Sequence, residues 1–289
     1  MYSDCFEGRP SDGERPSDSS ENGNKKGHFS LDEVSDLSHK SRNDLVRPCD
    51  IKGILHSHSR YCDGAHPLES MVSTARDIGL EYLGVSDHFK SYAHEDGMDL
   101  AAAKVQRQEI DILRKKNTDI GLLQGVELDA NPDGSLPVDD AVLLLFDYVI
   151  VSFPENGGYD PDTFTDQVVK VAQHPLVSIL GRPLGDMILQ PEGGQLDMKR
   201  VLEAAAEGGT AVEVNANPDT DHLDWAFCRM AQELGVLMSI SPDAHRAARL
   251  VDYRHGTELA HAAGVCCGNV LNTMHLDGLQ DYLGRNSRS

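Results

Sequence analysis

Residues 50–65 read DIKGILHSHSRYCDGA, a short apolar run that ends in two histidines and is followed by an aspartate. The run predicts a strand at residues 53–55, and comparable apolar runs recur along the chain. Each of them is separated from the next by a longer, amphipathic segment. The runs predict further strands at residues 82–86, 120–126, 148–152, 177–180, 211–214 and 237–240. Strands that alternate with helices in this way are typical of a mostly parallel sheet.

The segment between the first two predicted strands has the pattern of a helix that ends at Gly79. Its apolar residues recur at helical spacing, as Leu68, Met71, Val72, Ala75 and Ile78. Similar patterns predict helices around residues 100–116, 161–173, 197–207 and 222–235. Seven strands with intervening helices predict an α/β fold, either a closed or nearly closed barrel or an open, doubly wound sheet.

The composition is that of a soluble globular protein with a large acidic excess. The chain has 289 residues, with 47 Asp and Glu against 26 Lys and Arg, which gives a formal charge of −21. This charge disfavours unspecific binding to DNA or to an anionic membrane. No apolar stretch approaches the length of a membrane span, the N-terminus lacks signal-peptide features, and the cysteines form no CxxC pair. We expect a cytoplasmic protein with reduced thiols.

The first 45 residues differ in composition from the remainder of the chain. They are rich in Ser, Asp, Glu, Gly, Asn and Lys and contain almost no aliphatic cluster. Such a segment buries too little apolar surface to offset the entropy of ordering. We therefore expect a disordered polar tail at residues 1–45 and a single barrel domain at residues 46–289, with most of the negative charge on the domain.

Residues with metal-binding chemistry collect at the ends of the predicted strands. They are His56, His58 and Asp63 after the first strand, Asp87 and His88 after the second, Glu127 and Asp129 after the third, Asn215 and Asn217 after the sixth, and Asp243 and His245 after the seventh. A barrel or open sheet places its site at that edge. Two histidines one residue apart point the same way from an extended backbone. Taken singly, each such residue is more often structural, but their convergence favours a centre for Zn, Mn or Fe with more than one ion.

The motifs DIKGILHSHSRYCDGA, EYLGVSDH, GVELDANPDGSL, VEVNANPD and ISPDAHR resemble, in this order, those of the polymerase and histidinol phosphatase (PHP) superfamily. The resemblance is strongest to the PHP domain at the C-terminus of bacterial family-X DNA polymerases, and we expect it here to stand alone. It implies a distorted (β/α)7 barrel with a three-metal centre. It also implies two ligand sets: one of His56, His58, Glu127 and Asp243, the other of Asp63, His88 and His245.

Two positions depart from the family pattern. The family's second metal is held by the bridging glutamate and by histidines after the fourth and fifth strands, where this chain has Pro154 and Arg182. Neither side chain binds a divalent cation, so we expect one or two ions per chain. His174 precedes the fifth strand and is expected at the opposite end of the barrel. Arg182 is predicted either to hold a phosphate oxygen or to pair with Glu127 in an inactive site.

The resemblance implies a metal-dependent phosphoesterase that hydrolyses a small phosphomonoester or nucleotide with a metal-activated water. Candidate catalytic residues are Arg182, Asp129 and Asn215, whereas His94, near a predicted loop, is expected to be solvated. Two alternatives stay open: a PHP-derived binding or regulatory module that has lost the chemistry, and a 3′–5′ exonuclease or 3′-phosphatase on DNA ends. The acidic domain favours a small phosphorylated substrate over nucleic acid, and the oligomeric state is left open.

Overall fold

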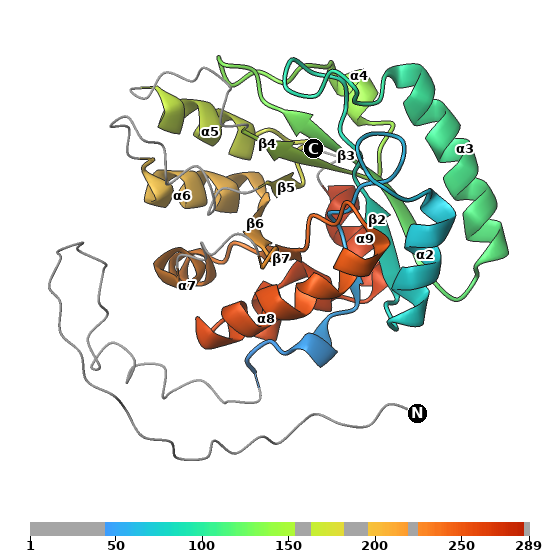
Figure 1. The fold of residues 1–289 in the computed structure, drawn as a ribbon. Coiled ribbons are helices and arrows are strands. Elements are labelled where there is room, and N and C mark those ends of the chain that lie inside the picture. The colour runs from blue at the N-terminus through green and yellow to red at the C-terminus, as the bar shows by residue number, and fades with distance from the viewer. Residues whose placement is uncertain (1–43, 154–162, 182–195, 219–224, 286–289) are drawn as a thin grey trace, which may run out of the picture. The chain divides into compact units, whose positions relative to one another are not determined.

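The computed structural model describes residues 44–153, 163–181, 196–218 and 225–285. In these residues seven parallel strands pair in the order in which they occur in the chain (Figure 1). They are β1 (Gly53–Ile54), β2 (Tyr82–Val85), β3 (Gly121–Asp129), β4 (Tyr148–Ser152), β5 (Ile179–Leu180), β6 (Ala211–Asn215) and β7 (Met238–Ser241). All seven predicted strands are present, and β3 continues three residues past its predicted end. Glu127 and Asp129 therefore lie within this strand and not after it.

The first and last strands approach each other at their carboxyl ends, so the sheet forms a nearly closed barrel. A bridge joins Ser57 to Ala244, and the backbone N–H of His58 donates to the carbonyl of Ala244 at 3.0 Å. An open, doubly wound sheet would separate these two strands, which excludes the alternative left by the sequence. The segments that close the barrel also carry the predicted site residues.

Helices surround the strands (Figure 1). The predicted ones are α2 (Leu68–Asp77), α3 (Leu100–Lys116), α5 (Phe164–Ala172), α6 (Met198–Gly208) and α7 (Trp225–Glu233). The structure adds α4 (Asp140–Leu143), α8 (Tyr253–Ala262), α9 (Leu276–Arg285) and four 3₁₀ turns: η2 (Pro48–Asp50), η4 (Ala247–Asp252), η5 (Cys267–Asn269) and η6 (Leu271–Thr273). None of the helices in the described residues has the length and apolar character that crossing a membrane requires.

The folded unit begins slightly before the predicted boundary at residue 46. The backbone N–H of Cys267 donates to the carbonyl of Asp44 at 2.8 Å, and Leu45 forms an antiparallel bridge with Cys266. Residues 44 and 45 are therefore part of the domain, because their backbone groups pair with it. The disorder predicted for the preceding residues falls outside the described residues.

The amino end of the barrel is packed with apolar side chains from the strands and from α9. Leu279 and Leu283 join the interior cluster that includes Tyr82 and Tyr148. The backbone N–H of Leu276, at the start of α9, donates to Glu81, which precedes β2. This packing leaves the carboxyl end of the barrel as the end at which polar side chains gather.

The ring of Tyr148 fills the barrel interior and leaves no room for a side chain at Gly125. A Cβ atom at Gly125 would lie 2.2 Å from Cζ of Tyr148, and Tyr148 is fixed by donating its hydroxyl to the carbonyl of Leu55. We expect Gly125→Ala to lower the free energy of unfolding by about 2 kcal/mol, as overpacked cores do. Chemical denaturation measures this. Gly278→Ala on α9, where a Cβ meets nothing within 4 Å, is the control and should not destabilise. Equal stability of the two variants would contradict the proposed clash.

Candidate metal centre

The seven side chains that the sequence predicts as metal ligands lie together at the carboxyl end of the barrel. They form two groups in which one candidate ligand atom from each residue lies within 4.8 Å of the others. The first group is His56, His58, Glu127 and Asp243, and the second is His58, Asp63, His88 and His245. The groups match the two sets implied by the resemblance, with the addition that His58 belongs to both.

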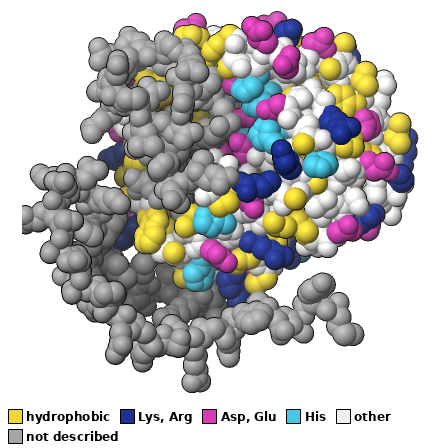
Figure 2. All heavy atoms as spheres, viewed as in Figure 1, with side chains coloured by type: hydrophobic (Ala, Val, Ile, Leu, Met, Phe, Trp, Pro, Cys, Tyr) yellow, Lys and Arg dark blue, Asp and Glu magenta, His cyan; other side chains and the backbone are white. Residues whose placement is uncertain are grey.

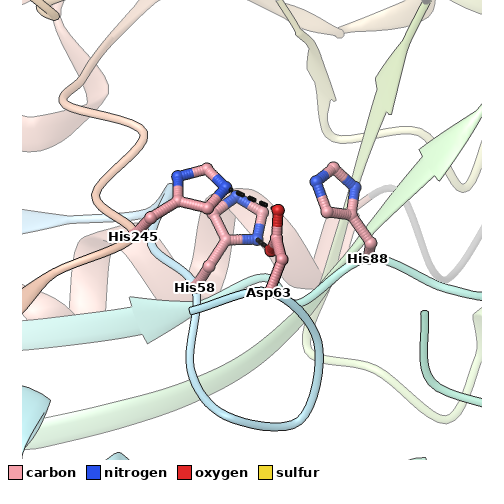
Figure 3. A group of neighbouring side chains, drawn as sticks. All are labelled: His58, Asp63, His88 and His245. Carbon is pink, nitrogen blue, oxygen red and sulfur yellow. Dashed lines mark ion pairs between the residues drawn. The ribbon is translucent and has the colours of Figure 1, made fainter. Parts of the chain in front are cut away.

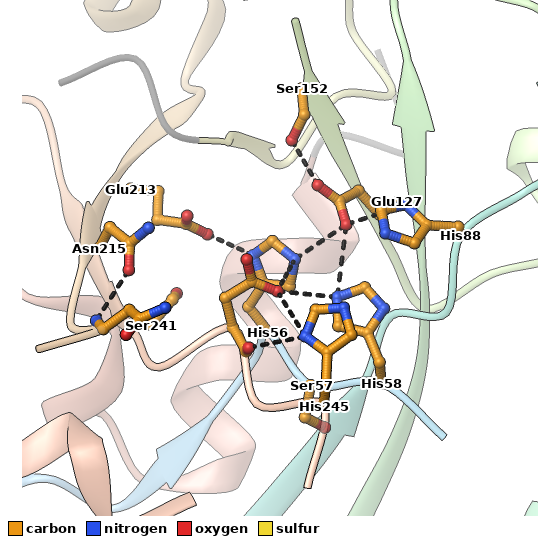
Figure 4. A network of polar contacts seen from close by, with 12 residues as sticks. His56, Ser57, His58, His88, Glu127, Ser152, Glu213, Asn215, Ser241 and His245 are labelled. Atoms are coloured by element: carbon orange, nitrogen blue, oxygen red, sulfur yellow. Dashed lines mark hydrogen bonds and ion pairs between the residues drawn. The ribbon is translucent and has the colours of Figure 1, made fainter. Parts of the chain in front are cut away.

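The first group has the spacing of ligand atoms around one cation (Figure 4). The Nε2 atom of His56 lies 3.0 Å from Oε2 of Glu127 and 3.4 Å from Oδ1 of Asp243. The Nε2 atom of His58 lies 3.4 Å and 3.0 Å from the same two oxygens. A tetrahedral ion with ligands at 2.0–2.1 Å holds them about 3.3 Å apart. These four side chains therefore fit a divalent cation.

The second group lies at the mouth of the barrel (Figure 3). Nε2 of His245 is 3.2 Å from Oδ2 of Asp63, and the other Asp63 oxygen is 4.0 Å from Nδ1 of His58. The side chains of His245 and Asp63 are 36% and 49% exposed, whereas those of His56, His58 and Glu127 are fully buried. In a space-filling view, histidine and acidic side chains gather on this face (Figure 2). Through Asp63 and His245, the second group is thus the more accessible of the two to solvent.

The charge of the pocket also favours a cation. Burial lowers the pKa of His56, but Glu213, Glu127 and Asp243 outweigh burial and raise that pKa well above its usual value. Burial likewise lowers the pKa of His245, yet its hydrogen bond to Asp63 and the charge of Asp243 raise it to about 9. Carboxylates therefore dominate the electrostatics at both histidines, and a divalent cation would neutralise them.

Two buried nitrogens of these histidines lack a hydrogen bond among the described residues. They are Nε2 of His58 and Nδ1 of His88, and each lies near a carboxylate oxygen, at 3.0 Å and 3.2 Å respectively. Buried polar atoms are rarely left without a partner. Because metal ligation satisfies an imidazole nitrogen, both atoms fit the proposed ligand sets.

The backbone at Asp243 is unusual in a way that suits a ligand. Its φ of 49° is the one positive value at a non-glycine residue in the described part of the chain. This left-handed conformation is costly for most side chains, tolerated by Asp, and common at functional sites. It turns the chain directly after β7, so that Asp243 and His245 both face the ligand groups.

Glu213 is a component of the centre that the sequence prediction missed. Its Oε2 lies 2.5 Å from Nδ1 of His56, and both side chains are fully buried. A carboxylate on one imidazole nitrogen orients the other nitrogen toward a metal. A signal for it was available, since Glu213 interrupts the apolar run of β6 and shares a strand face with the predicted residue Asn215.

Asp87 supports the loop that carries His58 and Asp63. Its carboxylate accepts from the backbone N–H of Ser59 at 2.5 Å and from the Ser59 hydroxyl at 2.6 Å. Nε2 of Gln106, on α3, donates to the same carboxylate. Cys62 also approaches Asp87, at 2.9 Å from Sγ, and burial raises the pKa of this thiol. A protonated thiol suits a packing residue and not a ligand.

His94 is not simply solvated, so that expectation is wrong. Its Nδ1 lies 2.7 Å from Oδ2 of Asp129, its side chain is 30% exposed, and that of Asp129 is 2% exposed. The imidazole stacks on His88, with ring centroids 3.5 Å apart and planes 12° apart. The sequence placed His94 in a loop, but loop conformation depends on hydrogen bonds that no periodic pattern reveals.

The remaining predicted residues divide into described and undescribed positions. The Asn215 side-chain oxygen accepts from the backbone N–H of Asn217 at 2.8 Å, which holds the turn after β6; its role toward a substrate stays a prediction. His174 precedes β5, lies 3.4 Å from Asp140 of α4, and belongs to none of the ligand groups found in the described residues. Pro154 and Arg182 lie outside the described residues.

Comparison with known proteins identifies the family. The family model named PHP domain matches residues 55–217, more than half of the chain. The chain belongs to the PHP domain family. This confirms the resemblance, and the nearly closed barrel of seven parallel strands is the PHP fold that it implied.

Relatives of this PHP domain include a DNA polymerase and several probable phosphatases. It is 32% identical to the DNA polymerase/3′-5′ exonuclease PolX of Bacillus subtilis over 84% of its own length, and it spans 43% of that relative. It is 23% identical to a probable phosphatase of Caldanaerobacter subterraneus, over 80% of this chain and 91% of the relative. The crystal structure of histidinol phosphate phosphatase from Lactococcus lactis, complexed with zinc, L-histidinol and phosphate, shares its fold. That structure matches with a TM-score of 0.53 and 17% identity, over 72% of this chain and 93% of that one.

Proposed function

We propose that this PHP domain is a phosphatase that depends on divalent metal ions and acts on a small phosphorylated molecule. The observation that carries the proposal is the pair of ligand groups that share His58, one largely buried and the other partly exposed through Asp63 and His245. Relatives of similar length are named probable phosphatases, which supports the same reaction class. Bound divalent cations would supply Lewis acidity, an activated water and charge neutralisation at the phosphoryl group.

The residues of the chain would hold and orient these cations. The largely buried first group, here called the inner group, would bind one ion, the inner ion, through His56, Glu127 and Asp243. The second group, here called the outer group, would bind another, the outer ion, through Asp63, His88 and His245. His58 would lie between the two ions. Burial of the inner group excludes bulk water, which strengthens electrostatic interactions there. The exposed outer group would admit the phosphate. Arg182 is proposed to bind a phosphate oxygen, and Asp129 and Asn215 to support the site.

Two ions, and not the three typical of the family pattern, are proposed for the inner and outer groups. Pro154 and Arg182 offer no ligand for the remaining ion. The hydroxyl of Ser152 donates to Oε1 of Glu127 at 2.5 Å, the oxygen that does not face the inner group. Because Oε1 already accepts this hydrogen bond, we propose that Glu127 binds the inner ion through Oε2 alone.

Purified protein reconstituted with Mn²⁺ or Zn²⁺ is expected to release inorganic phosphate from small phosphomonoesters, and chelation should abolish the activity. A panel of nucleoside monophosphates, sugar phosphates and histidinol phosphate, assayed by phosphate release, tests this. Glu127→Gln is the matched inactive variant, because it keeps the shape and removes a ligand charge. Absence of hydrolysis across metals and substrates, with ions bound, would instead support a binding or regulatory module.

A second candidate is a 3′–5′ exonuclease or 3′-phosphatase on DNA ends. The 32% identity to a protein named as polymerase and 3′-5′ exonuclease favours it, whereas the net charge of −21 opposes it. A 5′-labelled oligonucleotide incubated with the reconstituted protein distinguishes the two. Shortening of the oligonucleotide at low salt, without release of phosphate from small esters, would favour the exonuclease.

A further inference from the structure

A further contact, between His94 and Asp129, belongs to neither the inner nor the outer group. These two residues are here called the outer pair, which is distinct from the outer group. Their side chains come from the loop after β2 and from the last residue of β3. Nδ1 of His94 lies 2.7 Å from Oδ2 of Asp129. Candidate ligand atoms of His88, His94 and Asp129 lie within 4.8 Å of one another. An imidazole nitrogen and a carboxylate at this spacing are donors that a divalent cation accepts together.

The surroundings hold the outer pair in position. The hydroxyl of Ser91 donates to Asp129 and accepts from the backbone N–H of His94 at 3.0 Å. The carbonyl of His94 in turn accepts from the backbone N–H groups of Ser91 and Gly97, both at 3.1 Å. The loop therefore presents the imidazole to Asp129 in a fixed orientation. Because the His94 side chain is 30% exposed, solvent reaches this position.

The stacking on His88 indicates how two ions would be arranged. The nitrogen lone pairs of an imidazole lie in the plane of its ring. Two nearly parallel rings with centroids 3.5 Å apart therefore direct their lone pairs into two planes that are separated by a similar distance. The two rings therefore suit neighbouring ions better than one shared ion. Ions in two-metal sites are about 3.5–4 Å apart. His88 belongs to the group of the proposed outer ion, which leaves His94 for a different one.

We propose that the outer pair binds an additional, exchangeable divalent cation beside the two ligand groups, with water molecules completing its coordination. The cation would take the place of the hydrogen bond between His94 and Asp129, and these atoms would separate by a few tenths of an ångström. With two protein ligands and a partly exposed position, the site binds more weakly than the two groups of four. The cation would lie on the side of Glu127 that faces His88. This chain has Pro154 and Arg182 at the positions where the family pattern has two further histidine ligands.

The alternative is that the outer pair only anchors the loop, and His94→Gln separates the two roles. The Nε2 atom of glutamine can still donate a hydrogen bond to Asp129, so an anchoring role survives, but the amide nitrogen that then faces Asp129 has no lone pair with which to bind Mn²⁺. Mn²⁺ is titrated into the metal-free full chain without substrate, and unbound Mn²⁺ is counted by electron paramagnetic resonance. We expect the wild type to show a weak class of one ion per chain in addition to its tighter ions. His94→Gln should weaken that class more than tenfold and leave the tighter classes unchanged.

A matched control is His275→Gln at the opposite end of the barrel. His275 places its Nδ1 2.7 Å from Oε2 of Glu81, the same separation as in the outer pair, but outside every ligand group found in the described residues. This variant should bind Mn²⁺ like the wild type. Equal weak binding by His94→Gln and the wild type, or no weak class in the wild type, would overturn the proposal. Because no substrate is present, failure of the proposed phosphatase reaction leaves this result independent.

Discussion

Replacing His58 by alanine is expected to weaken both of the tighter metal sites, whereas replacing His56 should weaken one. His58 lies in both ligand groups, and its Nε2 is 3.0 Å from Asp243 and 3.4 Å from Glu127. Loss of a group that merely supports a ligand costs about 10–100-fold in metal affinity, so loss of a ligand should cost more than about 100-fold. Chelator competition measures both affinities, and phosphate release should fall at least in proportion.

The paired design separates a ligand from a structural histidine. Both rings are fully buried, so each alanine variant leaves a similar cavity and should lose similar thermal stability in the metal-free state. If the two variants lose the same number of ions, His58 does not join the groups, and the assignment of two sites with a common ligand is wrong.

Replacing Glu213 by glutamine is expected to weaken the inner ion by about 10–100-fold and to leave the outer ion unchanged. The carboxylate of Glu213 lies 2.5 Å from Nδ1 of His56 and touches no candidate ligand atom of the outer group in the described residues. Glutamine keeps the size and an acceptor oxygen but removes the charge that stabilises His56 in one orientation. Chelator competition gives the affinities, and ¹⁵N spectra of labelled histidine report which His56 nitrogen carries the proton.

The control for this substitution is Glu203→Gln on α6. Glu203 is a surface residue whose side chain is 47% exposed and lies 3.7 Å from Lys199. Glu203→Gln therefore makes the same chemical change far from the candidate metal centre. Unchanged inner-ion affinity in Glu213→Gln would show that the carboxylate is only a buried partner of His56. Equal weakening of both ions would indicate a general loss of structure instead.

The strands and most helices were predictable because their signals are local. Apolar runs and helical spacing depend on neighbouring residues. Four of the five residues that the spacing selected, Leu68, Met71, Val72 and Ala75, are the buried residues of α2, and the fifth, Ile78, follows its last residue. The convergence of ligands was also predictable, because parallel strands bring their carboxyl ends together. The helices α8 and α9 were missed, although α9 supplies Leu279 and Leu283 to the barrel interior.

The parts of the site that escaped prediction depend on contacts between distant residues or on loop conformation. Glu213 and His56 are separated by 157 positions, and no periodic pattern links them. The contact between His94 and Asp129 is supported by Ser91, whose hydroxyl hydrogen-bonds to both residues. The left-handed backbone of Asp243 has no sequence signal beyond the tolerance of aspartate for it. Pattern reading therefore finds the candidate ligands and leaves their supporting residues to the structure.

The seam between β1 and β7 would give the proposed metal centre a mechanical role. The seam is closed by a bridge between Ser57 and Ala244, and His58 and Asp243 lie on its two sides with side-chain atoms 3.0 Å apart. A cation bound by both His58 and Asp243 would crosslink the ends of the first and last strands and so close a loop of more than 180 residues. Closing so long a loop has a large entropic cost in the unfolded chain. Metal removal should therefore increase hydrogen exchange first along this seam, before it affects the strands between β2 and β6.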